Sequence, residues 1–172
     1  TIMILKEQGK LSFDDPVQNY LNNFPYPDVT IRHLLTHTSG LPDYEKLVLQ
    51  LDNKLSTKYF YRTGQSKENI TYEGEPSLYK EHHYILSMED VLELVIENRE
   101  KRKFMAGEKF KYSNTGYVLL AYIVEKISGQ TFESFMDQQI FIPLSMKNSS
   151  VWNLNTAAGK LEDRVQGTNN NK

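Results

Sequence analysis

Tyr112 and Asn114 stand two residues apart in a turn that leads directly into an apolar stretch, residues 118–124. A phenol can transfer a proton, and a carboxamide can both donate and accept hydrogen bonds. A helix that begins at this turn would hold both side chains on a rigid support. The pattern therefore predicts a candidate site made of a catalytic hydroxyl and a substrate-binding amide at the mouth of a helix.

A Tyr-x-Asn pair is weak evidence by itself, because a chain with 11 Tyr is expected to contain about one such match by chance. Tyr20 and Asn22 form a second match. Tyr112 could be a half-buried turn residue, and Asn114 could cap the following helix, a role that Asn fills well. The capping and substrate-binding roles of Asn114 can coexist. The flanking sequence must decide whether Tyr112 and Asn114 are catalytic or only structural.

Two upstream segments supply that context. Residues 7–16 read Glu-Gln-Gly-Lys-Leu-Ser-Phe-Asp-Asp-Pro, and residues 31–42 read Ile-Arg-His-Leu-Leu-Thr-His-Thr-Ser-Gly-Leu-Pro. In this order, and followed by the turn at residues 107–117, they resemble the serine β-lactamase-related family. That family includes class C β-lactamases, penicillin-binding D,D-peptidases, esterases and D-aminopeptidases. The resemblance covers much of residues 2–44 and 104–150.

The resemblance implies three catalytic elements, a Ser-x-x-Lys nucleophile motif, a Tyr-x-Asn motif and a Lys-Thr-Gly-like strand, which cleave an amide or ester through an acyl-enzyme. Tyr112 would be the proton shuttle. Because a free phenol has a pKa of about 10, it would need a nearby lysine ammonium to act as a base. Asn114 would bind the substrate amide, and Ser39 and Leu41 would line the rim as substrate-binding residues. His37 is interpreted as structural.

The chain departs from the family pattern in its nucleophile. The family's Ser-x-x-Lys is expected roughly twenty residues before Glu7, and the third motif is expected after residue 172. Ser77 begins a formal Ser-x-x-Lys match, but about one such match is expected by chance. It also lies in an irregular segment, so Ser77 is only a weak candidate. A smaller departure is Ala106, which stands where the family usually has Pro before Gly107.

The bulk composition bears on several other classes of protein. A net charge of −2 offers no electrostatic footprint for nucleic acid. The absence of cysteine excludes disulfides, thiolate metal sites and a cysteine nucleophile. His82 and His83 follow Glu81, but adjacent side chains point apart and rarely chelate together, so they are interpreted as surface residues. We expect no metal and no cofactor.

Apolar periodicity and capping residues predict a mainly helical chain. Residues 45–86 are predicted to form an irregular excursion, and Val151 with Trp152 is expected to begin a strand. The first predicted helices are a terminal segment closed by a left-handed Gly9, a short helix at 16–20 after Asp15, and a helix at 31–35 capped by Thr30. A fourth helix is predicted from a capping box at Ser87 to about residue 99. A fifth runs from a cap at Asn114 or Thr115 to about 127 and ends at Gly129, and a sixth covers 132–140 and is capped by Thr131.

The sequence therefore predicts a single partial domain over residues 1–172. Its expected class is mainly α, the helical domain of the β-lactamase/D,D-peptidase-like fold, with the flanking α/β sheet segments largely missing. Because the chain opens at Thr1 without Met and ends in a polar tail, we expect a fragment that is inactive alone.

The function expected by resemblance is a serine hydrolase for small-molecule or peptide substrates with a scissile amide or ester. The alternative is a non-catalytic helical interaction module or a pseudoenzyme. Self-association through an apolar face is also expected, because a large exposed apolar patch favours a partner. The resemblance implies a periplasmic, cell-envelope or secreted location.

Overall fold

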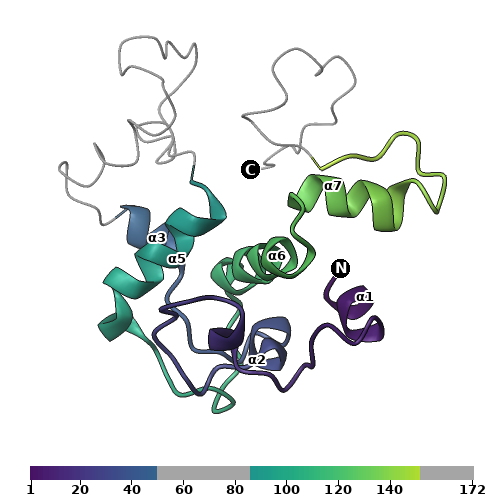
Figure 1. Ribbon diagram of the computed structural model, residues 1–172. Helices are drawn as coiled ribbons and strands as arrows, with labels where there is room; N and C mark the ends of the chain where they lie inside the picture. The colour runs from purple at the N-terminus through teal and green to yellow at the C-terminus, as the bar shows by residue number, and fades with distance from the viewer. Residues whose placement is uncertain (50–85, 152–172) are drawn as a thin grey trace, which may run out of the picture.

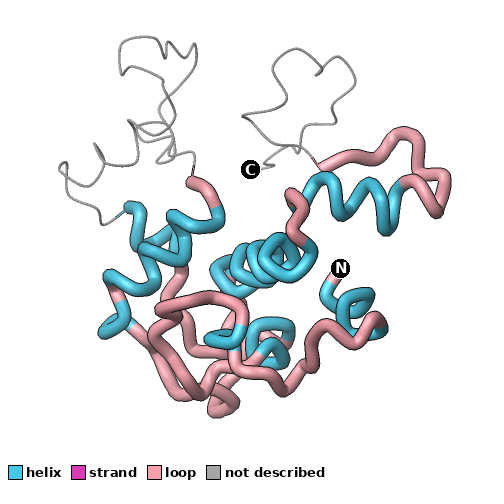
Figure 2. The backbone as a smooth tube through the Cα atoms, viewed as in Figure 1, coloured by secondary structure: helices cyan, strands magenta, loops and turns pink. Residues whose placement is uncertain are grey.

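The computed structural model describes residues 1–49 and 86–151 (Figure 1). Ser77, residues 81–83, most of the predicted excursion and Trp152 lie outside the described residues. Within the described ranges the chain forms helices and loops (Figure 2), together with an isolated antiparallel bridge between Pro16 and Thr30. The mainly α class and the single-domain boundary of the whole chain stay predictions.

The described helices are short, apart from one long helix near the C-terminal end. Their order and bounds are α1 Ile2–Glu7, η1 Val17–Asn19, α2 Ile31–Leu35, α3 Tyr44–Leu49, α5 Met88–Glu97, η3 Arg99–Lys101, α6 Asn114–Ser128, α7 Phe132–Met136 and the π-helical turn η4 Asp137–Phe141.

Helix α6 is the centre of this arrangement, and α1, α2, α5 and α7 all contact it (Figure 1). One face of α6 is apolar and packs inward, since Leu120, Ile123 and Val124 are buried and Ile127 packs partly buried against the same core. Burying apolar side chains is the main favourable term in folding. The core extends outward from α6 to these fully buried side chains of the surrounding elements: Leu5, Val17, Leu21, Phe24, Val29, Ile31 and Leu34.

Most of the predicted helix ends are confirmed. The side chains of Thr30, Ser87 and Thr131 each accept a hydrogen bond from the first turn of the helix that follows. Gly9 and Gly129 adopt left-handed backbone angles after their helices, with φ of +70° and +69°. These signals act within a few residues, which is why the sequence alone reveals them.

The predicted cap of α6 is wrong. Helix α6 begins at Asn114, so its N-cap is Ser113, and Ser113 makes no side-chain capping hydrogen bond. Asn114 is instead the first helical residue, and its side chain is engaged elsewhere. The predicted helix over 132–140 is also interrupted, because regular α-helix ends at Met136 and continues as the wider turn η4.

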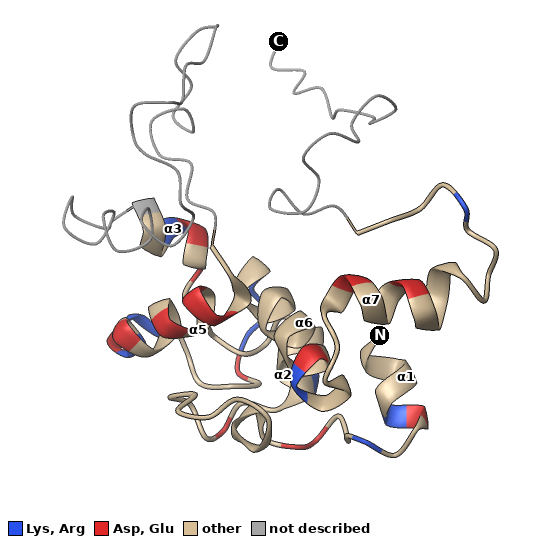
Figure 3. Cartoon of the chain, turned by 45° about the horizontal axis from the view of Figure 1, so that its top comes forward, with Lys and Arg blue, Asp and Glu red and all other residues tan. Residues whose placement is uncertain are grey.

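Charged residues of both signs are scattered over the described elements and are not gathered on one of them (Figure 3). Several large apolar side chains are exposed as well, including Met3, Ile142 and Leu144. Self-association through such a face stays a prediction. Among the described helices, none combines the length and the apolar character needed to cross a membrane.

Candidate active site

The segment that carries Tyr112 is tied to the loop after α2 by hydrogen bonds from backbone N–H groups on both sides of the tyrosine. The Lys111 N–H donates to the carbonyl oxygen of His37 at 2.8 Å. The Ser113 N–H donates to Nδ1 of the same histidine at 3.3 Å. The backbone position of Tyr112 is therefore set by a residue far away in the sequence.

The side chain of Tyr112 lies on the surface, 64% exposed. Its ring contacts the imidazole of His37, with ring centroids 4.6 Å apart. The Tyr112 hydroxyl makes no hydrogen bond to another described residue. It is therefore open to an incoming group.

Asn114 follows one residue later and is partly exposed. Its Nδ2 donates to Oε1 of Glu45, on α3, at 3.0 Å. This bond uses one donor of the amide and leaves the Oδ1 acceptor available. Because Glu45 holds the nitrogen, the carbonyl oxygen of Asn114 is the atom best placed to meet an N–H group of a ligand.

The residues on either side of Asn114 point inward. Ser113 and Thr115 are buried. The Thr115 hydroxyl donates to the carbonyl oxygen of Pro42 and accepts from the N–H of Tyr44, both at 2.8 Å. Thr115 is therefore a structural part of the site that sequence reasoning missed, and its only signal was its place inside the Tyr-Ser-Asn-Thr-Gly segment. It fixes the start of α6 to the loop that leads into α3.

Ser39 and Leu41 do not join Tyr112 and Asn114 at the surface. Their exposed fractions are 2% and 3%. Between them Gly40 accepts from the Lys103 N–H at 3.0 Å, so the loop is covered by the segment after η3. The substrate-binding role of Ser39 and Leu41 stays a prediction, and in this structure their side chains pack into the protein.

An ion pair holds that covering segment in place. The Arg102 guanidinium donates to both carboxylate oxygens of Asp28, at 2.8 and 2.6 Å, and it lies over the ring of Tyr26. The Ala106 N–H also donates to Asp28, at 3.1 Å. These hydrogen bonds hold the pKa of the Asp28 carboxyl below its ordinary value of 3.8, and those from Arg102 contribute most.

We expect Asp28→Asn to lower the free energy of unfolding at pH 7 by about 1–3 kcal/mol, because Arg102 would lose a charged partner while mostly buried. A lowered folded-state pKa adds stability above the unfolded pKa, and this contribution is lost as the pH falls through the folded value. The difference in the free energy of unfolding between the variant and the unsubstituted protein should therefore become smaller below about pH 4. Urea unfolding at several pH values measures it.

Asp14→Asn is the matched control for this prediction, since Asp14 pairs with Arg32 in the open, with exposed side chains on both partners. Exposed pairs contribute little to stability. A loss in Asp14→Asn as large as the loss in Asp28→Asn would contradict the anchoring role of the Arg102 pair.

No described lysine hydrogen-bonds the Tyr112 hydroxyl. Lys111 instead neighbours Lys103, whose pKa is lowered, first by burial and then by the Lys111 ammonium. A lysine ammonium beside Tyr112, which the resemblance implies, stays a prediction. The described residues also include no group of three or more His, Asp or Glu side chains that could hold a metal ion.

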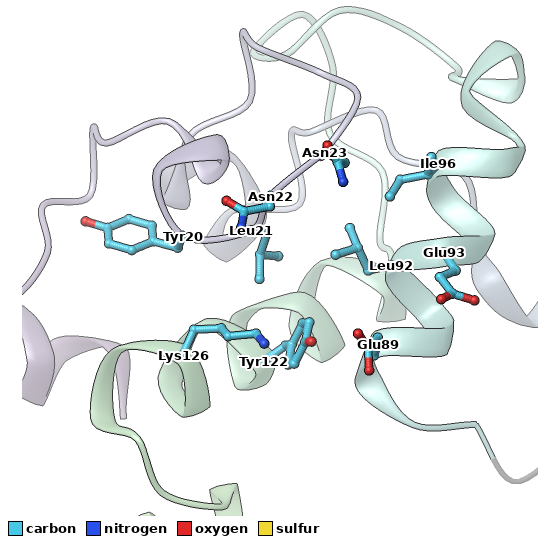
Figure 4. Close-up of a pocket in the computed structure, with 10 residues that line it drawn as sticks. All are labelled: Tyr20, Leu21, Asn22, Asn23, Glu89, Leu92, Glu93, Ile96, Tyr122 and Lys126. Carbon is cyan, nitrogen blue, oxygen red and sulfur yellow. The ribbon is translucent and has the colours of Figure 1, made fainter. Parts of the chain in front are cut away.

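A pocket of about 290 Å³ lies away from this turn, between the loop after η1, helix α5 and the C-terminal half of α6 (Figure 4). Leu21 and Leu92 contribute apolar surface, and Glu89 and Lys126 contribute charge. Neither Tyr112 nor Asn114 lines it, so the predicted site residues form an exposed turn and not this pocket.

Comparison with known proteins agrees with the resemblance in the sequence. A family model described as Beta-lactamase matches residues 1–171. Penicillin-binding protein 4* of Bacillus subtilis (strain 168) is 34% identical over 166 residues, covering 96% of this chain and 31% of that protein. The mitochondrial serine beta-lactamase-like protein LACTB of Homo sapiens is 31% identical over 187 residues, covering 83% of this chain and 33% of that protein.

The fold is similar to that of solved relatives as well. The crystal structure of a penicillin binding protein from Bacillus halodurans matches with a TM-score of 0.63 and 34% identity, over 90% of this chain and 39% of that one. The chain thus spans about a third of the length of these relatives. Since the family model runs across nearly all of its residues, the chain belongs to the serine beta-lactamase-related family.

Proposed function

We propose that this chain supplies the Tyr-x-Asn element of a serine hydrolase that cleaves amide or ester bonds through an acyl-enzyme. One observation carries the proposal. Along the turn, Tyr112 and Asn114 are the more exposed residues, while Ser113 and Thr115 between and after them are buried. The phenol and the amide are therefore presented together on a turn whose backbone is held by hydrogen bonds.

In the proposed reaction, a serine hydroxyl attacks the substrate carbonyl, and the proton that it loses passes to the oxygen of a deprotonated Tyr112. Tyr112 then returns this proton to the leaving amine or alcohol. Water cleaves the resulting acyl-enzyme and releases the acid. Asn114 accepts a hydrogen bond from a substrate N–H through Oδ1, which the bond from Nδ2 to Glu45 leaves available. The substrates are small molecules or peptides with a scissile amide or ester, and no cofactor takes part.

The described serines of the turn and of the loop after α2 are poor candidates for the nucleophile. Ser39 and Ser113 are both buried, and Ser77 lies outside the described residues. We therefore propose that residues 1–172 contribute the mainly helical part of the family's fold and do not hydrolyse substrate alone. The predicted export of the protein from the cytoplasm stays a prediction.

The proposal is tested with nitrocefin and a p-nitrophenyl ester on the full-length protein that carries these residues. We expect turnover of at least one of them, and a mass increase equal to the acyl group when the reaction is quenched. Asn114→Ala is expected to raise KM about tenfold or more, because a hydrogen bond to the substrate is worth about 1.5 kcal/mol.

Two results would contradict the proposal. If the full-length protein shows no turnover and forms no acyl adduct, this result would favour a non-catalytic module or a pseudoenzyme. An adduct on Ser77 in the isolated 172-residue chain would show that the nucleophile lies inside it. Glu7→Gln is the matched surface variant, because Glu7 is exposed at the end of α1, and it should leave KM unchanged.

A further inference from the structure

His37 contacts the proposed site through two hydrogen bonds and a ring contact with described residues, and the sequence analysis gave it only a structural role. It lies in the loop after α2, where its backbone φ is +57°. A non-glycine residue in this left-handed region is under strain, and such strain persists only where the surroundings enforce it. Observed strain of this kind is a reason to look for a function.

The imidazole ring of His37 is the common contact of three aromatic side chains. Ring centroids are 4.6 Å apart for Tyr112, 5.0 Å for Tyr117 and 5.9 Å for Phe110. Tyr117 is nearly parallel to the imidazole and is itself held by a hydrogen bond from its hydroxyl to the carbonyl oxygen of Leu35. The His37 ring is therefore fixed against α6 while it offers a surface to Tyr112.

One hydrogen bond also orients the ring. Nδ1 of His37 accepts from the Ser113 N–H at 3.3 Å. This bond fixes the orientation of the ring next to Tyr112, and the His37 carbonyl oxygen holds Lys111 on the other side.

We propose that His37 is a positioning residue that aims the Tyr112 side chain. The Tyr112 hydroxyl has no hydrogen bond to a described residue, and Tyr112 is largely exposed. Among the described residues, the His37 ring is therefore the ring contact that limits where this hydroxyl can point. This inference rests on the proposed function for Tyr112. It adds that the histidine of the Thr-His-Thr-Ser-Gly segment acts on the reaction through the tyrosine, without touching substrate.

Two variants separate the ring from the backbone bonds. His37→Asn keeps an acceptor atom near the Ser113 N–H and tolerates a positive φ, but it has no ring. His37→Gly tolerates the backbone angle and lacks both ring and acceptor. His33→Asn is the matched control, because His33 lies on α2, and its Nδ1 accepts from the Thr30 N–H at 3.2 Å without a ring contact to Tyr112.

The first measurement is the proton NMR signal of the Tyr112 ring, assigned with Tyr112→Phe. We expect the ring-current shift from His37 to disappear in both His37 variants and to remain in His33→Asn. The second measurement is kcat of the full-length protein. Because small misplacements of a reacting group cost up to about 100-fold, we expect kcat to fall about 10- to 100-fold in both His37 variants, with KM nearly unchanged.

Several outcomes would overturn the inference. One is a wild-type kcat in His37→Asn together with a reduced kcat in His37→Gly, because the hydrogen bond alone would then position Tyr112. Another is an unchanged Tyr112 signal in both His37 variants, and a third is an equal loss of kcat in His33→Asn. If Tyr112→Phe itself leaves kcat unchanged, the proposed function fails, and the NMR signal still decides whether His37 positions the ring.

Discussion

Tyr112→Phe is expected to lower kcat/KM of the full-length protein by about 10²- to 10⁴-fold, the range typical for loss of a general acid–base group. The substitution removes only the hydroxyl, which is exposed and makes no hydrogen bond to another described residue. The ring contact with His37 can be kept by phenylalanine. We therefore expect the free energy of unfolding to change little, so that the loss of activity is separated from a loss of fold.

Tyr117→Phe is the control for this experiment. Tyr117 lies in the same aromatic cluster and is 50% exposed, but its hydroxyl donates to the carbonyl oxygen of Leu35 at 3.1 Å. Removing this bond should cost about 1 kcal/mol of stability and leave kcat/KM within about threefold. A Tyr112→Phe protein with full turnover, or a Tyr117→Phe protein with an equally large loss, would refute the assignment of Tyr112 as the proton shuttle.

The second large effect is expected for stability, at Gly40. Its φ is +71°, and a Cβ placed there would lie 2.0 Å from the backbone oxygen of Phe104. Gly40→Ala therefore combines an unfavourable backbone angle with a contact that only movement of the covering segment can relieve. We expect the free energy of unfolding to fall by about 3 kcal/mol or more, measured by urea denaturation.

Gly129→Ala separates these two contributions. Gly129 has nearly the same backbone angle, φ +69°, but a Cβ there would meet nothing within 4 Å. Only the cost of the left-handed angle remains, about 1 kcal/mol. If the two alanine variants lost equal stability, the close approach of Phe104 to Gly40 would not be the cause.

The Gly40 contact also matters for the site. The Gly40 and Thr38 carbonyl oxygens accept from Lys103 and Gly107, so the segment that leads to Tyr112 passes directly over the loop containing His37. Displacing this segment would disturb the backbone on both sides of Tyr112. Gly40→Ala is therefore expected to reduce activity as well as stability, in contrast to Gly129→Ala.

Short-range signals in the sequence were enough to locate most of the helices and the candidate turn. Thr30, Ser87 and Thr131 cap helices because their side chains reach N–H groups only three residues away. Gly129 ends α6 because it adopts a left-handed angle without a Cβ penalty. The motifs around Tyr112 are likewise continuous stretches, which is why family membership could be predicted before any geometry was known.

The partners of these residues were decided by tertiary structure. Asn114 or Thr115 was expected to cap α6, yet the Asn114 side chain bonds Glu45, 69 residues away in the sequence. Arg102 pairs with Asp28 at a separation of 74 residues. No local periodicity or capping pattern predicts contacts across such separations, because these contacts form only when segments far apart in the sequence pack together.

The sequence by itself thus located most of the helices, though not α3 (Tyr44–Leu49), and identified the turn that carries the phenol and the amide. Only the folded chain decided which neighbours face that turn. It buried Ser39 and Leu41 and brought His37, 76 residues before Ser113, against Tyr112. The physical reason is that burial and ring contact are properties of packed surfaces, and a surface is assembled from segments that the sequence lists far apart.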